Sequence, residues 1–228
     1  MKKLIVRRTL LFTLIFTAAV YLAGCETMQG VTNKTKEMFG VQKRAILVSE
    51  VKEARTSMEE VKAKFQTTME TFNTVLTSNE GKLDKKYRIL KSEHEKIGNK
   101  AGAIQENISS VSKVADELFI EWQTELNSYS SESLRKSGEQ MLQNAKNHNT
   151  QFINAMTQAD EKAGPVITAL GDLVLFSKHN LNAQDMASVK GEMDSLAGKV
   201  TALITEIDAS ISEADKLIDL MEGSEAAQ

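Results

Sequence analysis

The sequence has little of three kinds of residue that shape other classes of protein: cysteine, proline and the aromatics. Among 228 residues, Cys25 is the only cysteine, Pro165 is the only proline, and aromatic residues make up 5%. A single cysteine excludes an intramolecular disulfide and a metal site built from several cysteines. The scarcity of proline, together with the abundance of alanine, leucine, glutamate and lysine, favours helices over strands.

The first 25 residues have the composition of an export signal. An uncharged run over residues 9–22 follows a basic start formed by Lys2, Lys3, Arg7 and Arg8, and the run leads into Leu22, Ala23, Gly24 and Cys25. This order is typical of a cleaved secretory signal. The last four residues resemble a bacterial lipoprotein signal, which implies cleavage before Cys25, diacylglycerol on its sulfur and an acyl chain on its amino group. Two or three acyl chains anchor a protein stably.

Two alternatives to this reading remain open. An uncleaved transmembrane anchor is one, but only 17 uncharged residues separate Arg8 from Glu26, which is at the short end of what spans a bilayer. A twin-arginine signal is the other, because Arg7 and Arg8 are adjacent. No serine precedes the pair and the run that follows is strongly apolar, which favours the ordinary secretory route.

Cleavage changes the charge and the chemistry of the chain. It removes four of the 28 basic residues and none of the 31 acidic ones, which leaves 24 basic residues and a net charge of −7. This charge argues against nucleic acid and against an anionic membrane surface as electrostatic partners. If Cys25 is acylated, the mature chain has no free thiol.

The mature chain begins with a segment that has no clear periodicity. Residues 25–40 include Gly30, Asn33 and Gly40 among loosely spaced apolar residues, and we interpret them as a lipidated tether with room for one short helix. The predicted organisation is therefore a signal peptide at 1–24, a tether at 25–40, a helical domain at 41–222 and a disordered tail at 223–228.

In the first half of the helical domain, apolar residues recur at alternating steps of four and three, the heptad pattern of helices packed along a seam. The first run is Leu47, Val51, Ala54, Met58, Val61, Phe65, Thr68, Phe72 and Val75. After a turn near residues 78–81, the second run is Leu83, Tyr87, Leu90, His94, Ile97, Ala101, Ile104, Ile108, Val111, Ala115, Leu118, Trp122, Glu125 and Tyr129.

The second half contains two more runs. Serines at 128, 130, 131 and 133 predict a turn and a helix N-cap. The third apolar run follows them and consists of Leu134, Gly138, Met141, Ala145, His148, Phe152, Ala155, Ala159, Ala163, Val166, Leu170 and Leu173. Two successive steps of four at residues 155–163 predict a stutter, and Pro165 predicts a kink. Asn182 and Asp185 resemble a capping box. The fourth apolar run follows them and consists of Met186, Val189, Met193, Leu196, Val200, Leu203, Ile207, Ile211, Ala214, Ile218 and Met221.

Four long helices joined by short loops predict an all-α fold, an elongated antiparallel four-helix bundle or coiled coil. In this topology the loops at 77–82 and 178–183 share the end far from the membrane. The turn at 127–134 and the carboxyl terminus share the near end.

Three segments resemble a known family. They are Val41–Val48, the pair Glu121–Leu126 and Ser133–Arg135, and Val174–Ala183, and they are similar to bacterial exported helical proteins known as domain of unknown function 2959. The resemblance runs from about Val41 to Met221. It implies a helical, exported protein, and it carries no catalytic residues because the family has no assigned activity.

The three histidines do not form a metal site in the predicted bundle. A turn near Ser131 places His94 about 30 Å along the bundle from His148 and about 16 Å from His179. We interpret His94 and His148 as half-buried seam residues that set register. Lys91, Ala145 and Phe176 stand three residues before the histidines, where a di-iron bundle needs glutamate. With no phosphate loop or nucleophile elbow either, we predict neither an enzyme nor a bound metal.

A candidate docking site lies in the loop formed by Lys178, His179, Asn180, Leu181 and Asn182. A plain helix turn with an N-cap is the alternative for this loop. For Trp122 and Tyr129, packing along the seam is favoured over a platform for a ligand.

These features predict a periplasmic scaffold or adaptor, anchored by lipid and without a cofactor other than its acyl chains. It would act on an envelope protein or associate with itself, and Ile104, Ile108 and Leu118 would hold its seam. The alternative is a bundle that opens to bind lipid or another apolar ligand. Glu26 and Thr27 are not a clear signal for retention at the inner membrane, so we expect the outer membrane, facing the periplasm.

Overall fold

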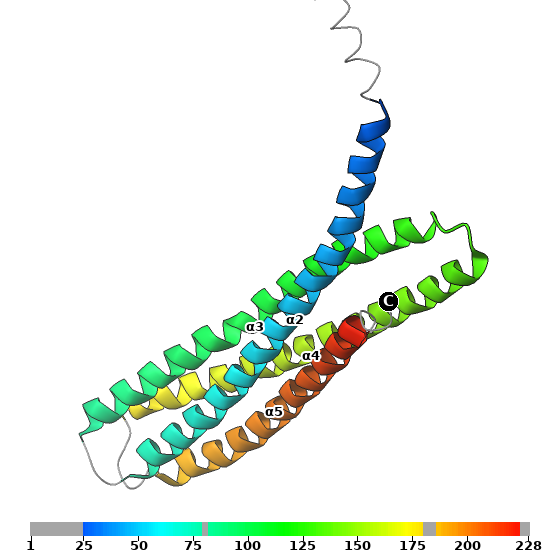
Figure 1. Cartoon of the computed structure of the whole chain (residues 1–228). Helices are drawn as coiled ribbons and strands as arrows, with labels where there is room; N and C mark the ends of the chain where they lie inside the picture. Colours follow the sequence, from blue (N-terminus) through cyan, green and yellow to red (C-terminus); the bar gives the residue numbers. More distant parts are fainter. Residues whose placement is uncertain (1–24, 79–81, 180–185, 224–228) are drawn as a thin grey trace, which may run out of the picture. The chain divides into compact units, whose positions relative to one another are not determined.

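The computed structural model describes residues 25–78, 82–179 and 186–223. Over these residues it contains four helices, α2 (Cys25–Thr77), α3 (Leu83–Leu126), α4 (Glu132–Ser177) and α5 (Met186–Gly223), and no strand (Figure 1). The chain divides into an N-terminal unit, Met1–Lys43, and a bundle unit, Arg44–Gln228. The predicted all-α class is confirmed, and the described part of the chain is a helical bundle.

Helix α2 begins sixteen residues before the expected start of the helical domain, counting from Cys25 to Val41. Residues 25–40, which we interpreted as a tether with room for one short helix, are the first part of a 53-residue helix. Glycine costs only about 1 kcal/mol in a helix interior, so Gly30 and Gly40 do not by themselves end it. The role of this segment as a tether remains a prediction. The signal residues Leu22, Ala23 and Gly24 lie outside the described residues.

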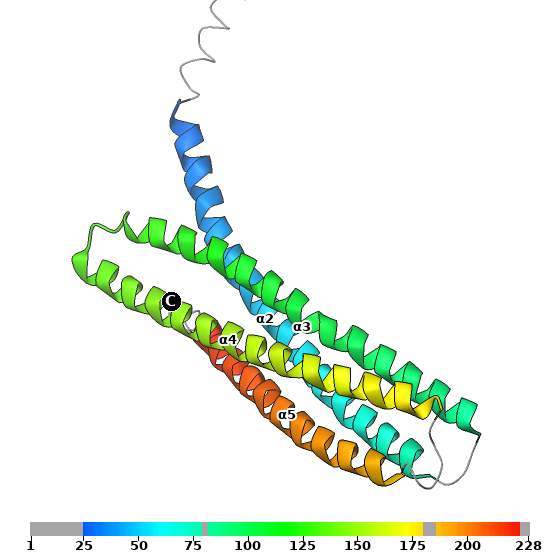
Figure 2. The same cartoon turned by 180° about the vertical axis from the view of Figure 1, so that it is seen from behind.

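Successive helices of the bundle unit run antiparallel (Figures 1 and 2). Helix α3 packs against α4, and α4 packs against α5. Helix α2 is also antiparallel to α3. Lys64 of α2 pairs with Glu93 of α3, and Glu50, which lies earlier in α2, accepts a hydrogen bond of 2.5 Å from Ser110, which lies later in α3.

Ion pairs between α2 and α5 connect the first and last helices of the bundle. Lys52 Nζ lies 2.5 Å from Glu222 Oε1, and Lys62 Nζ lies 2.6 Å from Asp208 Oδ1. Residue numbers rise along one helix as they fall along the other, so these two helices are also antiparallel.

The seam of α2 follows the predicted heptad closely. Leu47, Met58 and Phe65 are fully buried, as is Thr68, which the spacing also placed on the seam. At the end of the run Leu76 is buried in place of Val75, which is half-buried. The register predicted for this helix is confirmed over residues 47–72.

In α3 the heptad holds in the middle and fails at both ends. Leu90, Ile97 and Ile104 are fully buried, whereas Leu83 is 40% exposed. At the other end Leu126 is buried in place of Glu125. The predicted run ended with Tyr129, which lies beyond the helix in the turn.

In α4 the predicted stutter is wrong. The inward residues step without interruption by three and four through Leu142, Ala145, Asn149, Phe152, Met156, Ala159, Ala163, Val166, Leu170, Leu173 and Ser177. Our run chose Met141 and Ala155 where the structure buries Leu142 and Met156. Neighbouring positions are 100° apart around a helix, so two apolar residues in succession leave the choice to the packing partners.

Helix α4 also continues through Pro165 from Glu132 to Ser177. The proline ring is on the exposed side, where water can reach the carbonyl group that it leaves without a donor. The bend predicted at this residue remains a prediction. At the start of the helix, the predicted serine cap is confirmed, because the Ser131 hydroxyl accepts a hydrogen bond from the Leu134 amide.

Helix α5 contains two buried residues that the sequence analysis missed. Ser210 is fully buried between Ile207 and Ala214, and Leu217 is buried beside Ile218. Our run stepped from Ile207 to Ile211, which is only half-buried. Gly223, expected as a cap, is the last residue of the helix. Asn182, Asp185 and the tail at 224–228 lie outside the described residues.

Candidate interaction surface

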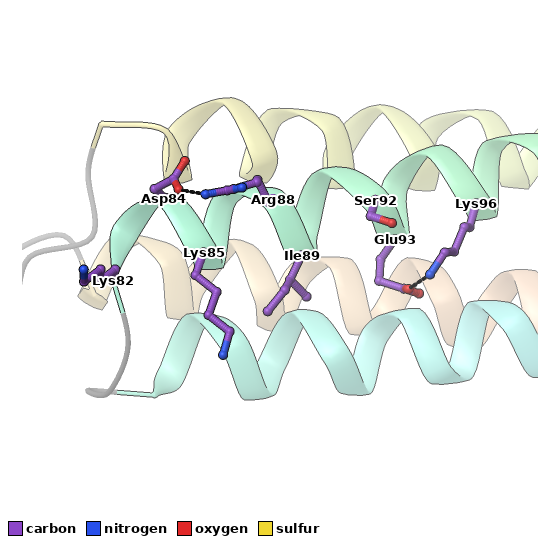
Figure 3. Close-up of a pocket in the computed structure, with 8 residues that line it drawn as sticks. All are labelled: Lys82, Asp84, Lys85, Arg88, Ile89, Ser92, Glu93 and Lys96. Atoms are coloured by element: carbon purple, nitrogen blue, oxygen red, sulfur yellow. Dashed lines mark hydrogen bonds and ion pairs between the residues drawn. The ribbon is translucent and has the colours of Figure 1, made fainter.

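The N-cap residue and the first four turns of α3 line an open depression of about 540 Å³. Its lining is rich in basic side chains: Lys82, Asp84, Lys85, Arg88, Ile89, Ser92, Glu93 and Lys96. Figure 3 shows Lys85 and Ile89 extending from α3 toward the ribbon of α2, with Arg88 joined to Asp84. Seven of these residues belong to α3 and Lys82 is its N-cap residue. The depression faces solvent, so it is suited to surface contact rather than to enclosing a small molecule.

Glu93 organises the charges at this depression. Its carboxylate pairs with Lys64 of α2 and lies 2.8 Å from Lys96 Nζ of its own helix. Hydrogen bonds from Lys64 and then Lys96 hold the pKa of Glu93 below its ordinary value, against a smaller opposing effect of burial. Glu93 therefore joins α2 to α3 and neutralises part of the basic depression.

The candidate docking loop begins at the same end of the bundle, where α4 ends beside the start of α3 (Figures 1 and 2). Lys178 and His179 are exposed. The Lys178 amide donates to the Leu175 carbonyl at 3.2 Å, and the His179 amide donates to the Phe176 carbonyl at 3.4 Å. Asn180, Leu181 and Asn182 lie outside the described residues, so the docking role of this loop remains a prediction.

The structure separates His94 from His148. His94 is half-buried between α3 and α4, with Nε2 3.2 Å from the Ile167 carbonyl oxygen. Gly171 provides the room, because a Cβ there would lie 3.1 Å from the same nitrogen. His148 lies 19 residues before Ile167 on α4, a separation of about 29 Å along the helix.

His148 is half-buried, and its Nδ1 is buried without a hydrogen-bond partner in the described part of the chain. Within the same residues, no group of three or more His, Cys, Asp or Glu side chains could hold a metal ion. Both His94 and His148 are half-buried, as the spacing predicted.

Trp122 lies near the other end of α3 and packs against the core rather than forming an open platform. The Arg44 guanidinium stands over its ring, with Cζ 5.3 Å from the ring centroid, a cation–π contact. Close by, partial desolvation and then the charge of Glu121 raise the pKa of Glu125. Tyr129, predicted for the seam, is instead 49% exposed in the turn.

The feature that the sequence analysis missed is the outward face of α3. We define the α3 stripe as the twelve exposed residues at helical spacing along it: Asp84, Arg88, Lys91, Glu95, Asn99, Gly102, Glu106, Ser109, Lys113, Glu117, Ile120 and Thr124. Ile120 is 69% exposed, the largest exposed fraction among the large apolar side chains that the structure describes.

A family model matches residues 33–221, most of the chain, with the description "Protein of unknown function (DUF2959)". The chain belongs to this family. The resemblance seen in Val41–Val48 and in the later segments is thus confirmed. Among curated proteins and among solved structures, no match was found. As a DUF2959 protein it has an established family and fold class, and its function has to be argued from its own residues.

Proposed function

We propose that this DUF2959 protein is a scaffold or adaptor of the bacterial cell envelope, held by lipid on Cys25 and facing the periplasm. It acts through contacts with an envelope protein or with itself and catalyses no reaction. The outer membrane is the expected site of the anchor. The acyl chains on Cys25 are its only prosthetic groups.

The observation that carries this proposal is the packing of the bundle together with its charged exterior. Every helix contributes side chains of zero or near-zero exposure to one continuous core, including Phe65, Phe72, Phe152 and Leu203. A seam filled by its own side chains supports a rigid body that presents surfaces. It gives less support to the alternative of a bundle that holds lipid or another apolar ligand between its helices.

The N-terminal sequence supports the location. Leu22, Ala23, Gly24 and Cys25 follow a basic and then an apolar segment, the order of an export signal. No helix within the described residues is both long and apolar enough to cross a bilayer.

Crosslinking in intact cells at native expression tests the proposal. Protein partners are recovered by affinity purification and identified by mass spectrometry, with Cys25→Ser as the comparison. We expect a reproducible envelope protein whose recovery falls when the anchor is lost. Incorporation of a labelled fatty acid into the native chain and not into Cys25→Ser verifies the acylation itself.

Other outcomes would overturn the proposal in distinct ways. Recovery of co-purified lipid alone would favour the apolar-ligand bundle. Recovery of the same partners with Cys25→Ser, without fatty-acid labelling of the native chain, would show that lipid does not anchor the protein.

A further inference from the structure

We propose that the depression at the start of α3 is a docking site for an acidic segment of a protein partner, in which carboxylates flank an apolar side chain. The proposal rests on the proposed function in one respect, that the partner is a protein of the envelope. Binding at the depression itself does not need the lipid anchor.

The depression carries more positive than negative charge. Its basic and acidic lining residues, taken together with Lys64 of α2, which pairs with Glu93, are Lys64, Lys82, Asp84, Lys85, Arg88, Glu93 and Lys96. Five of these residues are basic and two are acidic, so their net charge is +3.

Both carboxylates of this set are already paired within the molecule. Asp84 pairs with Arg88, and Glu93 is shared between Lys64 and Lys96. One carboxylate therefore serves two ammonium groups at Glu93, and a positive charge is left over there.

Two further cations of the depression have no such partner. Among the residues that the structure describes, the ammonium groups of Lys82 and Lys85 make no hydrogen bond or ion pair. Figure 3 shows Lys85 extending toward the ribbon of α2, beside Ile89. These lysines are thus available to a carboxylate from outside the chain.

The neighbouring side of α2 does not cancel this charge. From Lys64 it continues, at steps of three and four, through the uncharged residues Thr67, Thr71, Val75 and Ser78. Glu70 is the only acidic residue between Lys64 and Ser78. It is exposed and lies about 120° around the helix from Lys64.

The positive charge of the depression is exceptional in this molecule. The bundle unit contains 21 basic and 29 acidic residues, a net charge of −8. Lysines at the start of a helix also oppose the helix dipole, which favours acidic groups there. Helix stability therefore does not account for Lys82 and Lys85, whereas an acidic partner does.

The remaining lining indicates which kind of acidic partner fits. Ile89 is half-buried among the cations, and the lining contains no aromatic residue. Single-stranded nucleic acid is bound by stacking on aromatic rings, and a free phosphate offers charge alone. An acidic protein segment offers carboxylates for the lysines together with an apolar side chain for Ile89.

Fluorescence anisotropy with a labelled synthetic peptide tests this site. The peptide has one leucine flanked on each side by glutamates, and the protein is the chain from residue 25 onward with Cys25→Ser. We expect saturable binding whose Kd rises between about 0.05 M and about 0.5 M salt. A peptide with serine in place of leucine should bind about threefold or more weakly, because it loses the apolar contact.

The site variant combines Lys82→Glu with Lys85→Glu. It should raise the Kd for the acidic peptide about tenfold or more, because two attractions become repulsions. It should also bind a peptide with lysines in place of the glutamates more tightly than the unchanged protein does. Glutamates at the start of a helix are favoured by its dipole, so the variant should fold, as circular dichroism verifies.

The control variant combines Lys113→Glu, on the α3 stripe, with Lys199→Glu on α5. It makes the same change of net charge at exposed positions. Lys113 lies 28 residues from Lys85, or about 42 Å along the helix, which exceeds the range of unscreened charge. The control variant should therefore leave the Kd within about twofold of its original value.

Several outcomes would overturn the proposal. One is the absence of saturable peptide binding at low salt, and another is an equal effect of the site and control variants. Equal binding of the leucine and serine peptides would show a site for anions in general. Binding to phosphatidylglycerol vesicles that the site variant loses, without binding of the peptide, would identify a lipid surface as the partner instead.

Crosslinking in cells separates this proposal from the adaptor proposal. The site variant should reduce recovery of the envelope partner relative to the control variant, without changing fatty-acid labelling of Cys25. Unchanged recovery would show that the partner docks elsewhere, and the adaptor proposal would stand. Peptide binding as expected, with no envelope protein recovered from cells, would count against the adaptor proposal alone.

Discussion

Gly138 shows how a single residue controls the approach of two helices. It lies on α4 against Leu126 of α3, and a Cβ at this position would be 2.4 Å from Leu126 Cδ2. Leu126 is itself buried, with 1% of its surface exposed. The absence of a side chain at residue 138 is thus what allows Leu126 to fill the seam near the α3–α4 turn.

Gly138→Ala is expected to destabilise the protein. Overpacking costs about 1–3 kcal/mol, which exceeds the gain of about 0.5–1 kcal/mol that alanine brings to a helix. Gly198→Ala on α5 is the matched control, because a Cβ there meets nothing within 4 Å and only the gain should remain. Thermal unfolding by circular dichroism should show Tm falling in the first variant and rising in the second. Two increases would show that Leu126 rotates away at no cost.

The lowered pKa of Glu93 makes the stability of the folded protein depend on pH. Its folded pKa lies below the ordinary value because Lys64 and Lys96 stabilise the carboxylate. The unfolded state therefore binds more protons, and the stabilisation is present above the ordinary pKa of about 4.3 and is lost as pH falls through the folded pKa. Glu93→Gln should consequently lower Tm at pH 7 and lower it less at pH 3. The same loss at both pH values would indicate that Glu93 acts through packing rather than charge.

Within an element, burial and not residue type decides what an isoleucine contributes. Ile104 and Ile120 lie on the same helix, but Ile104 is fully buried and Ile120 is 69% exposed. Ile108 lies between them and is half-buried, so only part of its side chain packs in the seam to which we assigned it.

Ile104→Ala should cost about 2–5 kcal/mol, because it removes buried methyl groups and leaves a cavity. Ile120→Ala should change stability by no more than about 0.5 kcal/mol. Chemical denaturation would measure both values. Ile108→Asp, which places a charge beside the core, should also lower Tm. An unchanged Tm for Ile104→Ala or Ile108→Asp would contradict the seam assignment.

The elements also show where sequence reasoning succeeds. Over residues 47–72 of α2 the apolar residues on the seam have few apolar neighbours, and the structure contains the predicted register, whereas at the adjacent pair Val75 and Leu76 the pattern led to the wrong member. In α4 Met141 stands next to Leu142, and Ala155 stands next to Met156. Either member of each pair would keep a heptad step, and the pattern alone led to the wrong member and to a stutter that the helix does not contain.

At the scale of the whole molecule, the bundle unit is closed by contacts between residues far apart in the chain. Arg55 Nε donates a hydrogen bond to Asp215 Oδ1 at 2.5 Å, and Lys162 pairs with Glu206. Periodicity within one helix carries no information about such pairs, since they depend on the relative shift of two helices. The α3 stripe becomes visible as a surface for the same reason, once the neighbours of α3 have covered its other sides.

The sequence by itself determined the all-α class, the family, the register of α2 and the expectation of an exported, lipidated chain, because each of these follows from local pattern or composition. The tertiary structure decided which of two adjacent apolar residues enters the seam of α4, that Ser210 is buried in α5, and that His94 fits beside Gly171. Those outcomes depend on the space left by neighbouring helices. A helix presents several possible faces, and only its packing partners select the one that is buried.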